Sequence, residues 1–260
     1  MRTLDECKNE RRRWLESERV DEAAKAELLS YSDEELRAAM NGYMNFRTAG
    51  LRAKMGAGTA LMNVYTVAHA TKALADYILS CGGDAARRGV AIAYDSRINS
   101  PEFSMRAAEV LSAAGITVYL YGELRPTPVL SFALRELGCV AGINITASHN
   151  PSEYNGYKVY WEDGAQIGPE QANAISALIA KTDILSGVPA ASEARHELIL
   201  PMPAEIDEKY RECVLAQQVD PSMIPAMADR MKIVYTPLHG AGITMVPEVL
   251  MRAGVKNLYI

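Results

Sequence analysis

The chain has 260 residues, of which 49% are hydrophobic, and a formal net charge of −5 at pH 7. This length can bury a full core in one large α/β domain or in two smaller ones. The acidic balance provides no basic field of the kind that holds a phosphate backbone, which excludes nucleic acid as an expected partner. No apolar run reaches the roughly 18 residues of a membrane span, and the charged start lacks the apolar core of a signal peptide. We therefore expect a cytoplasmic protein with no membrane partner, and composition leaves the oligomeric state open.

The cysteines are widely scattered and include no CxxC pair: Cys7, Cys81, Cys139 and Cys213. This spacing argues against a zinc site and against a disulfide framework. The sequence therefore predicts reduced thiols with mostly structural roles.

The first 45 residues predict a helical extension. Residues 3–40 are charged and helical in pattern, and Ser32 to Glu35 form a capping box that begins a helix. The charge run is most simply a solvated face, with a docking surface as the alternative. The next stretch, residues 46–63, contains glycine and too few periodic apolar residues for a regular element, so we expect a loop there.

A repeated rhythm of strand, helix and glycine then follows. Helices are expected at residues 64–78, 100–114, 127–137 and 169–181, and strands at 90–94, 116–121, 140–145 and 156–161. Ser100 is the expected N-cap of its helix and Pro101 the first helical residue. This alternation predicts an α/β fold: a three-layer domain with a mixed, largely parallel sheet between helices, preceded by the helical extension and followed by an incomplete second α/β domain.

The domain boundaries follow from composition. Residues 186–203 carry Pro, Ala, Ser and Gly without periodicity and are expected to connect two domains, the first spanning residues 46–203. The second unit, residues 204–260, shows a helix at 206–217, a strand at 232–236, a helix at 244–253 and a strand at 255–260. Because the chain stops on that strand, we expect residues 204–260 to be the truncated start of a second domain.

The most informative stretch is residues 143–151, Ile-Asn-Ile-Thr-Ala-Ser-His-Asn-Pro. It places Ser148 in a polar turn beyond the carboxyl end of an apolar strand, where open α/β sheets bind their ligands. A hydroxyl there can attack phosphorus and, once phosphorylated, can hold about two negative charges among the donors of the loop. For a lone serine the alternative is a turn in which Ser148 and Asn150 cap local backbone groups.

The string Thr-Ala-Ser-His-Asn-Pro, followed by Asn-Gly-Tyr-Lys at residues 155–158, resembles the phosphoserine loop of the phosphohexomutase superfamily. The resemblance implies that Ser148, Lys158 and His149 form the catalytic group, with Ser148 as the phosphorylated residue. It implies that Lys158 serves as an acid/base or phosphate contact, that His149 and Asn150 shape the loop, and that Asn150 belongs to the phosphate and substrate site. A lysine that merely extends to solvent from a strand end is the alternative for Lys158.

Two upstream stretches match the same family in the same order. Residues 46–52, Phe-Arg-Thr-Ala-Gly-Leu-Arg, resemble the phosphoglucomutase entry motif and imply that Arg52 faces the phosphate, although Arg47 stands where the family usually has glycine. The Asp-Ser-Arg triplet at residues 95–97 resembles the Asp-x-Arg segment of the family. It implies that Arg97 braces the phosphoserine loop within the phosphate site, with a strand-end ion pair as the alternative. Residues 235–242 resemble the opening of the second domain of the family, and His239 is assigned no catalytic role.

The resemblance implies a phosphosugar mutase that interconverts sugar 1-phosphate and 6-phosphate through a phosphoserine and a bisphosphate intermediate. Met55-Gly56 and Met62-Asn63 look most like the phosphoglucomutase and phosphopentomutase subgroup, so glucose phosphate is favoured, with phosphopentomutase or glucose-1,6-bisphosphate synthase activity as alternatives. Glucose 1,6-bisphosphate is the expected activator or intermediate, and a phosphosugar the expected substrate.

The expected cofactor is Mg²⁺, held in the family by the phosphate on the serine, here Ser148, and by an Asp-x-Asp-x-Asp-Arg loop. That run does not occur in this sequence, and the sugar-binding and phosphate-binding loops of the family's third and fourth domains are absent as well, so we expect the chain by itself to be inactive as a mutase. A non-catalytic phosphate-binding fragment is therefore a second hypothesis. A third is a serine hydrolase using Ser148 and His149, which is disfavoured because adjacent residues seldom form the hydrogen bond between nucleophile and base.

Overall fold

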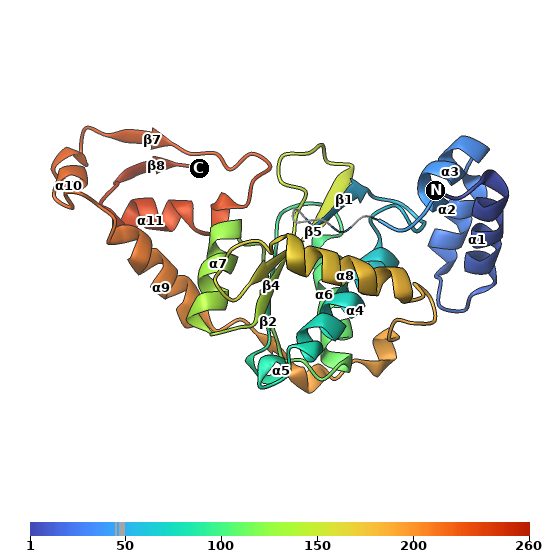
Figure 1. Ribbon diagram of the computed structural model, residues 1–260. Helices are drawn as coiled ribbons and strands as arrows, with labels where there is room; N and C mark the ends of the chain where they lie inside the picture. Colours follow the sequence, from blue (N-terminus) through green and yellow to red (C-terminus); the bar gives the residue numbers. More distant parts are fainter. Residues whose placement is uncertain (45, 47–49) are drawn as a thin grey trace.

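The computed structural model describes residues 1–44, 46 and 50–260 (Figure 1). Its centre is a six-stranded sheet with the order β1-β5-β4-β2-β3-β6. The strands are β1 (Leu51–Lys54), β2 (Val90–Tyr94), β3 (Val118–Leu120), β4 (Ala141–Ile145), β5 (Tyr154–Trp161) and β6 (Ile199–Pro201). Strands β4, β2, β3 and β6 run parallel, whereas β5 pairs antiparallel with both β4 and β1. The expectation of a mixed, largely parallel sheet is confirmed.

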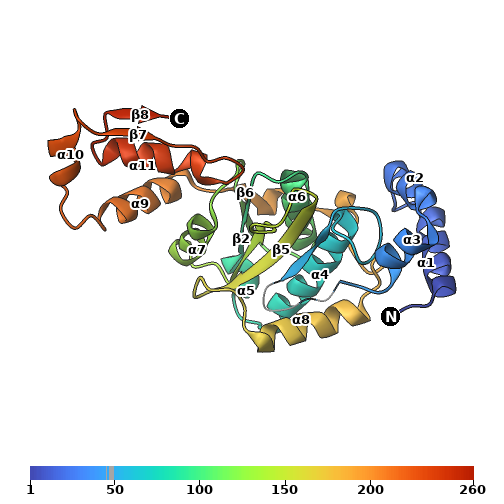
Figure 2. The ribbon, with the colours of Figure 1, turned by 90° about the horizontal axis from the view of Figure 1, so that it is seen from above.

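Helices cover both faces of this sheet (Figure 2). One face packs against α4 (Val64–Ser80), α6 (Ser100–Ala113) and α8 (Pro169–Lys181), and the other against α7 (Thr127–Glu136). The short helix α5 (Ala85–Arg88) precedes β2. Every residue of β2 and β4 is buried, because alternate side chains of each strand enter one of the two helical layers. The result is a three-layer α/β arrangement, as the alternating pattern of the sequence predicts.

Three helices precede the sheet: α1 (Leu4–Glu16), α2 (Glu22–Ser30) and α3 (Asp33–Met40). The expected capping box is present, since the Ser32 hydroxyl accepts a hydrogen bond from the Glu35 N–H and the Glu35 carboxylate accepts one from the Ser32 N–H. Their shared core contains Cys7, Trp14, Leu28, Leu36 and Met40. The charged residues thus surround a small apolar core, at the end of the molecule coloured blue in Figure 1.

Residues 204–260, here called the second unit, lie at the opposite end of the molecule (Figure 1). They form α9 (Ala204–Leu215), α10 (Met223–Met227), β7 (Lys232–Val234), α11 (Val246–Arg252) and β8 (Asn257–Tyr259). Strands β7 and β8 make a separate two-stranded parallel sheet. Single-turn 3₁₀ helices occur at Ala191–Glu193, His196–Leu198 and Gly242–Thr244. Within the described residues, no helix is both long enough and apolar enough to span a bilayer.

Two segments expected to be irregular each contain a short strand. The prediction of a loop over residues 46–63 is wrong for β1, which pairs with β5 and buries Leu51 to 2% exposure. Residues 186–203, in which no periodicity was expected, contain β6, which pairs with β3 at the edge of the first domain's sheet. Both are edge strands of three or four residues, and each pairs with a neighbouring strand on one side only. So short a run does not show a recognisable alternation of apolar and polar residues in the sequence. Pro201 is tolerated in β6 because an edge strand leaves some N–H groups unpaired.

The start of α6 also differs from its expected form. Ser100 is not the N-cap but the first helical residue, and Asn99 occupies the N-cap position with a left-handed φ of 63°. The Ser100 hydroxyl instead donates to Asp95 Oδ1 at 3.2 Å and accepts from Asn155 Nδ2 at 3.0 Å. The Ser100 hydroxyl therefore bonds with distant residues and does not cap the helix. Arg47, the departure from the entry motif, lies outside the described residues.

Gly156 provides a test of how closely β5 packs between its two neighbours. A Cβ at this position would lie 2.6 Å from the Thr146 carbonyl oxygen and 2.8 Å from that of Leu51. We expect Gly156→Ala to lower the free energy of unfolding by about 1–3 kcal/mol, because the backbone on both sides must shift. Gly122→Ala is the matched control, since nothing lies within 4 Å of its Cβ position. Urea unfolding followed by circular dichroism measures both, and equal stability of the two variants would contradict this packing.

Candidate active site

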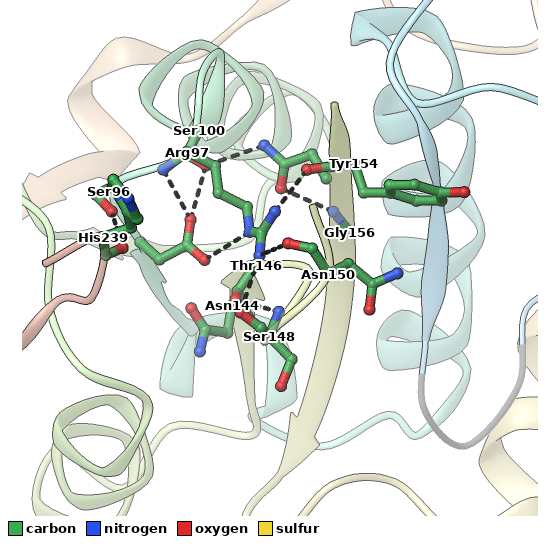
Figure 3. Close-up of polar contacts among 12 residues, drawn as sticks. Ser96, Arg97, Ser100, Asn144, Thr146, Ser148, Asn150, Tyr154, Gly156 and His239 are labelled. Carbon is green, nitrogen blue, oxygen red and sulfur yellow. Dashed lines mark hydrogen bonds and ion pairs between the residues drawn. The ribbon is translucent and has the colours of Figure 1, made fainter. Parts of the chain in front are cut away.

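Ser148 lies directly beyond the carboxyl end of β4, where its exposed side chain follows the buried Thr146 and Ala147 (Figure 3). Its backbone is left-handed, with φ of 62°. The turn is closed by two short-range hydrogen bonds, from the Ser148 N–H to Thr146 Oγ1 at 2.9 Å and from the Asn150 N–H to the Ala147 carbonyl at 3.2 Å. A non-glycine residue in this conformation costs about 1–3 kcal/mol and persists only where its surroundings hold it.

The main restraint on this loop is the guanidinium of Arg97, which follows β2. Its Nε donates to Asp95 Oδ2 at 3.2 Å, and the side chains of both residues are largely buried. Its two terminal nitrogens donate to four backbone carbonyls at 2.7–3.0 Å, those of Ser148, Asn150, Pro151 and Tyr154 (Figure 3). All five N–H groups of the guanidinium are thus engaged by protein atoms. Arg97 thus holds the serine loop in place, and we refer to its side chain as the brace of the loop.

Asp95 fixes the brace in turn. Its Oδ1 accepts hydrogen bonds from the Arg97 N–H at 3.1 Å and from the Ser100 hydroxyl at 3.2 Å. Asn155 links this group to the loop from the other side, because its amide donates to Ser100 Oγ and to the Ile98 carbonyl, both at 3.0 Å. The carboxyl ends of β2 and β4 are therefore joined by one continuous polar network.

Arg52 and Asn150 meet on the other side of the loop, and Lys158 lies near enough to feel the charge of Arg52. Arg52 on β1 donates to Asn150 Oδ1 at 2.8 Å. Lys158 lies on β5, in register with Asn144 of β4. Partial burial lowers the pKa of Lys158 below its usual value of 10.5, the nearby charge of Arg52 lowers it further, and Asp95 opposes both. A lysine with this shift holds its proton less tightly than a free lysine does.

A cleft of about 1050 Å³ opens in front of Ser148. Its walls come from four segments: residues 95–98, residues 125–128 at the start of α7, residues 146 and 148–152 of the serine loop, and residues 237–241 of the second unit. Ser148, His149, Asn150 and Arg97 line this cleft, whereas Arg52 and Lys158 flank the loop from β1 and β5. The Ser96 hydroxyl donates to the His239 carbonyl at 2.7 Å, which joins the two sides.

Sequence reasoning missed Arg125 and Thr127 as residues of this cleft. Both lie in the segment between β3 and α7, and the carboxyl ends of parallel strands meet at one edge of a sheet, so their position in the chain was an available signal. The Thr127 hydroxyl accepts a hydrogen bond from Asn144 Nδ2 at 2.8 Å. The side chain of Asn144 is buried, and its Oδ1 has no partner among the described residues.

The described residues do not fit a Mg²⁺ site around Ser148. They include no group of three or more His, Cys, Asp or Glu side chains placed to hold a metal ion. Asp95 is the carboxylate nearest the brace, and both of its oxygens already accept hydrogen bonds from Arg97 or Ser100. Mg²⁺ requires oxygen ligands in near-octahedral geometry, which a single occupied carboxylate does not supply.

The fold and the site together define an α/β domain that presents a serine-centred loop in a cleft at the carboxyl edge of its sheet. The model of the phosphoglucomutase/phosphomannomutase alpha/beta/alpha domain I matches residues 43–185. The chain belongs to this family.

Individual relatives agree with that assignment. The phosphoglucomutase of Staphylococcus epidermidis is 39% identical over 221 residues, which cover 84% of this chain and 39% of the relative. The phosphopentomutase of Mus musculus is 39% identical over 173 residues, which cover 64% of this chain and 28% of the relative. The crystal structure of a candidate phosphomannomutase from Thermus thermophilus has a TM-score of 0.66 at 27% identity and covers 83% of this chain and 45% of that one. The chain thus spans about two fifths of the length of the staphylococcal relative.

The effect of the Arg52 charge on the pKa of Lys158 can be tested, because its direction is known. Because Arg52 disfavours the protonated lysine, we expect Arg52→Gln to raise the pKa of Lys158 toward 10.5. Carbon-13 NMR of the Lys158 side chain across an alkaline titration measures the change. Arg87→Gln, which removes an exposed charge at the far end of α5, is the control and leaves this pKa unchanged. An unchanged or lower pKa in Arg52→Gln would show that the two charges do not interact.

Proposed function

We propose that Ser148 is the phosphoryl carrier of a phosphosugar mutase. The observation that carries this proposal is the braced loop, in which Arg97 binds four carbonyls and thereby holds Ser148 in a left-handed conformation facing the cleft. Because the loop already holds Ser148 in one geometry, the serine does not need to reorganise during phosphoryl transfer. Membership of the phosphoglucomutase/phosphomannomutase family supports the same role.

In the proposed loading step, Ser148 Oγ attacks phosphorus of a sugar bisphosphate, which leaves a sugar monophosphate; the reverse step returns the phosphoryl group from Ser148 to a sugar hydroxyl. A bond forms between phosphorus and Oγ, the bond between phosphorus and the sugar oxygen breaks, and that oxygen leaves with the electron pair. The proton of the hydroxyl passes to a base, and the sugar oxygen gains a proton. Lys158 suits this exchange because its lowered pKa brings the neutral and charged forms closer in energy near neutral pH.

The remaining residues have supporting roles in this proposal. Arg52, held by Asn150, supplies positive charge beside the phosphoserine, which carries about two negative charges. His149 is exposed and lines the cleft. Arg97 serves as the brace of the loop, since its five N–H groups are engaged by the protein.

Glucose phosphate is the favoured substrate and pentose phosphate the second candidate. A phosphoglucomutase matches over 84% of this chain, and a phosphopentomutase matches over 64% at the same identity. The metal loop that the resemblance implies does not occur in this sequence. We therefore propose that this chain by itself does not complete the Mg²⁺-dependent mutase cycle, and that its activity is limited to the half-reaction, the loading of Ser148.

Phosphate mapping tests the proposal. We expect that incubation of the chain with glucose 1,6-bisphosphate adds one phosphate and that fragmentation by mass spectrometry locates it on Ser148. Ser148→Ala should abolish the addition, whereas Ser152→Ala, which removes another hydroxyl of the same cleft, should retain it. Phosphate on another residue, or labelling that survives Ser148→Ala, would refute the assignment. A parallel assay with a fluorophosphonate probe tests the serine hydrolase hypothesis, for which covalent labelling of Ser148 is the positive result.

A further inference from the structure

Arg125 joins the cleft to the second unit. It follows β3, and its backbone N–H donates to the Tyr94 carbonyl at the end of β2 at 3.0 Å. Its guanidinium contacts Asp207 twice, with Nε 3.0 Å and Nη2 2.8 Å from Oδ2. The two side chains are only 14% and 11% exposed. A residue that lines the cleft thus forms a largely buried ion pair with a residue 82 positions away.

Other groups complete this pair. The Tyr121 hydroxyl donates to Asp207 Oδ1 at 3.2 Å, and the Arg125 guanidinium lies over the Tyr121 ring at 5.2 Å. The remaining terminal nitrogen, Nη1, donates to the Leu124 carbonyl at 2.8 Å and lies 3.5 Å from Glu123. Both oxygens of Asp207 are therefore engaged by the end of β3, and the geometry of the pair is fixed from several directions.

Asp207 lies in the first turn of α9, which is the first helix of the second unit and lies beside α7 (Figure 1). Ion pairs tie α9 to α11: Glu208 with Arg252 at 2.9 Å, and Arg211 with Glu248 at 3.0 Å. Ile206, near the start of α9, and Met245, at the N-cap of α11, are buried in the same apolar cluster as Tyr121. Because the turn at residues 237–241 closely precedes α11, its position depends on how α9 is anchored.

A second contact across the cleft is weaker. The hydrogen bond from Ser96 to the His239 carbonyl joins two exposed residues, so water can replace it at little cost. Breaking the pair of Arg125 and Asp207 leaves a largely buried charge without its partner, which is far less favourable. The buried pair therefore dominates the placement of the turn.

We propose that Arg125 is a positioning residue: through Asp207 and Tyr121 it fixes the second unit so that the turn at residues 237–241 faces Ser148 across the cleft. This inference rests on the proposed function, in which that cleft receives the sugar phosphate. Arg125 acts through the placement of the opposite wall and forms no bond to the reacting phosphorus.

The native cysteines allow a direct measurement. Cys81 at the end of α4 and Cys213 on α9 are exposed, whereas Cys7 and Cys139 are buried, so spin labels attach selectively to one site on each side. We expect a single narrow distance distribution for the wild type and a broader or shifted one for Arg125→Gln and for Asp207→Asn. Arg87→Gln is the charge-matched control on an exposed arginine. Circular dichroism confirms that each variant is folded, and Asp207→Asn, which preserves shape, covers the case in which Arg125→Gln does not fold.

A kinetic readout separates positioning from mere stability. We expect Arg125→Gln to slow the loading of Ser148 from glucose 1,6-bisphosphate by about tenfold or more, because misplacement of one wall by about 1 Å has effects of this size. Arg125→Lys, which retains the charge without the two-nitrogen contact, should recover part of the rate. Unchanged distances in both pair variants, or broadened distances with a wild-type loading rate, would overturn the inference. If wild-type Ser148 is never loaded, the proposed function fails, while the distances still decide whether Arg125 fixes the second unit.

Discussion

The presentation of Ser148 depends on the guanidinium of Arg97. Four carbonyls of one loop converge on two nitrogens of this side chain, and each would otherwise require water or another donor. Charge-assisted hydrogen bonds of this kind contribute about 1.5–3 kcal/mol each, enough together to offset the cost of the left-handed backbone at Ser148. Asp95 neutralises the arginine and orients it, so the loop, the brace and its counter-ion form one unit.

Sheet topology places this unit where it can act. Strands β2, β3 and β4 are parallel neighbours, and the residues that follow them supply Arg97, Arg125 and the serine loop respectively. Ligands bind at the carboxyl edges of such sheets because loops from adjacent strands converge there. The antiparallel strand β5 returns from the serine loop to place Lys158 beside it, and β1 adds Arg52 from the far side of β5. Residues spread over more than one hundred positions are thereby brought to the serine loop and the strands beside it.

Much of this arrangement could be predicted from the sequence. Helix caps, glycine stops and buried apolar runs are local signals, and they located β2, α7, β4 and α8 to within about a residue. Ser148 was found because its motif is contiguous. The sheet type followed from the alternation of strands and helices, which leaves few topologies for a chain of this length.

The features that escaped prediction depend on distant partners. Strands β1 and β6 are short edge strands that are defined by pairing with β5 and β3. Ser100 looked like a helix cap, but Asp95 and Asn155 draw its hydroxyl into the brace network. The role of Arg125 was missed because its partner, Asp207, lies 82 positions away in the chain. Local sequence patterns do not indicate such contacts, because they join residues that are far apart in the chain.

The most direct test of the central claim is the rate at which glucose 1,6-bisphosphate phosphorylates Ser148 in an Arg97→Lys variant. Lysine retains the positive charge, but its single ammonium group cannot reach four carbonyls and Asp95 together. We expect a rate at least about tenfold below that of the wild type, because the loop no longer holds the serine in one geometry. Arg87→Lys, the same exchange on an exposed arginine, should react at the wild-type rate. Equal phosphorylation of Ser148 in Arg97→Lys and wild-type protein would contradict the account.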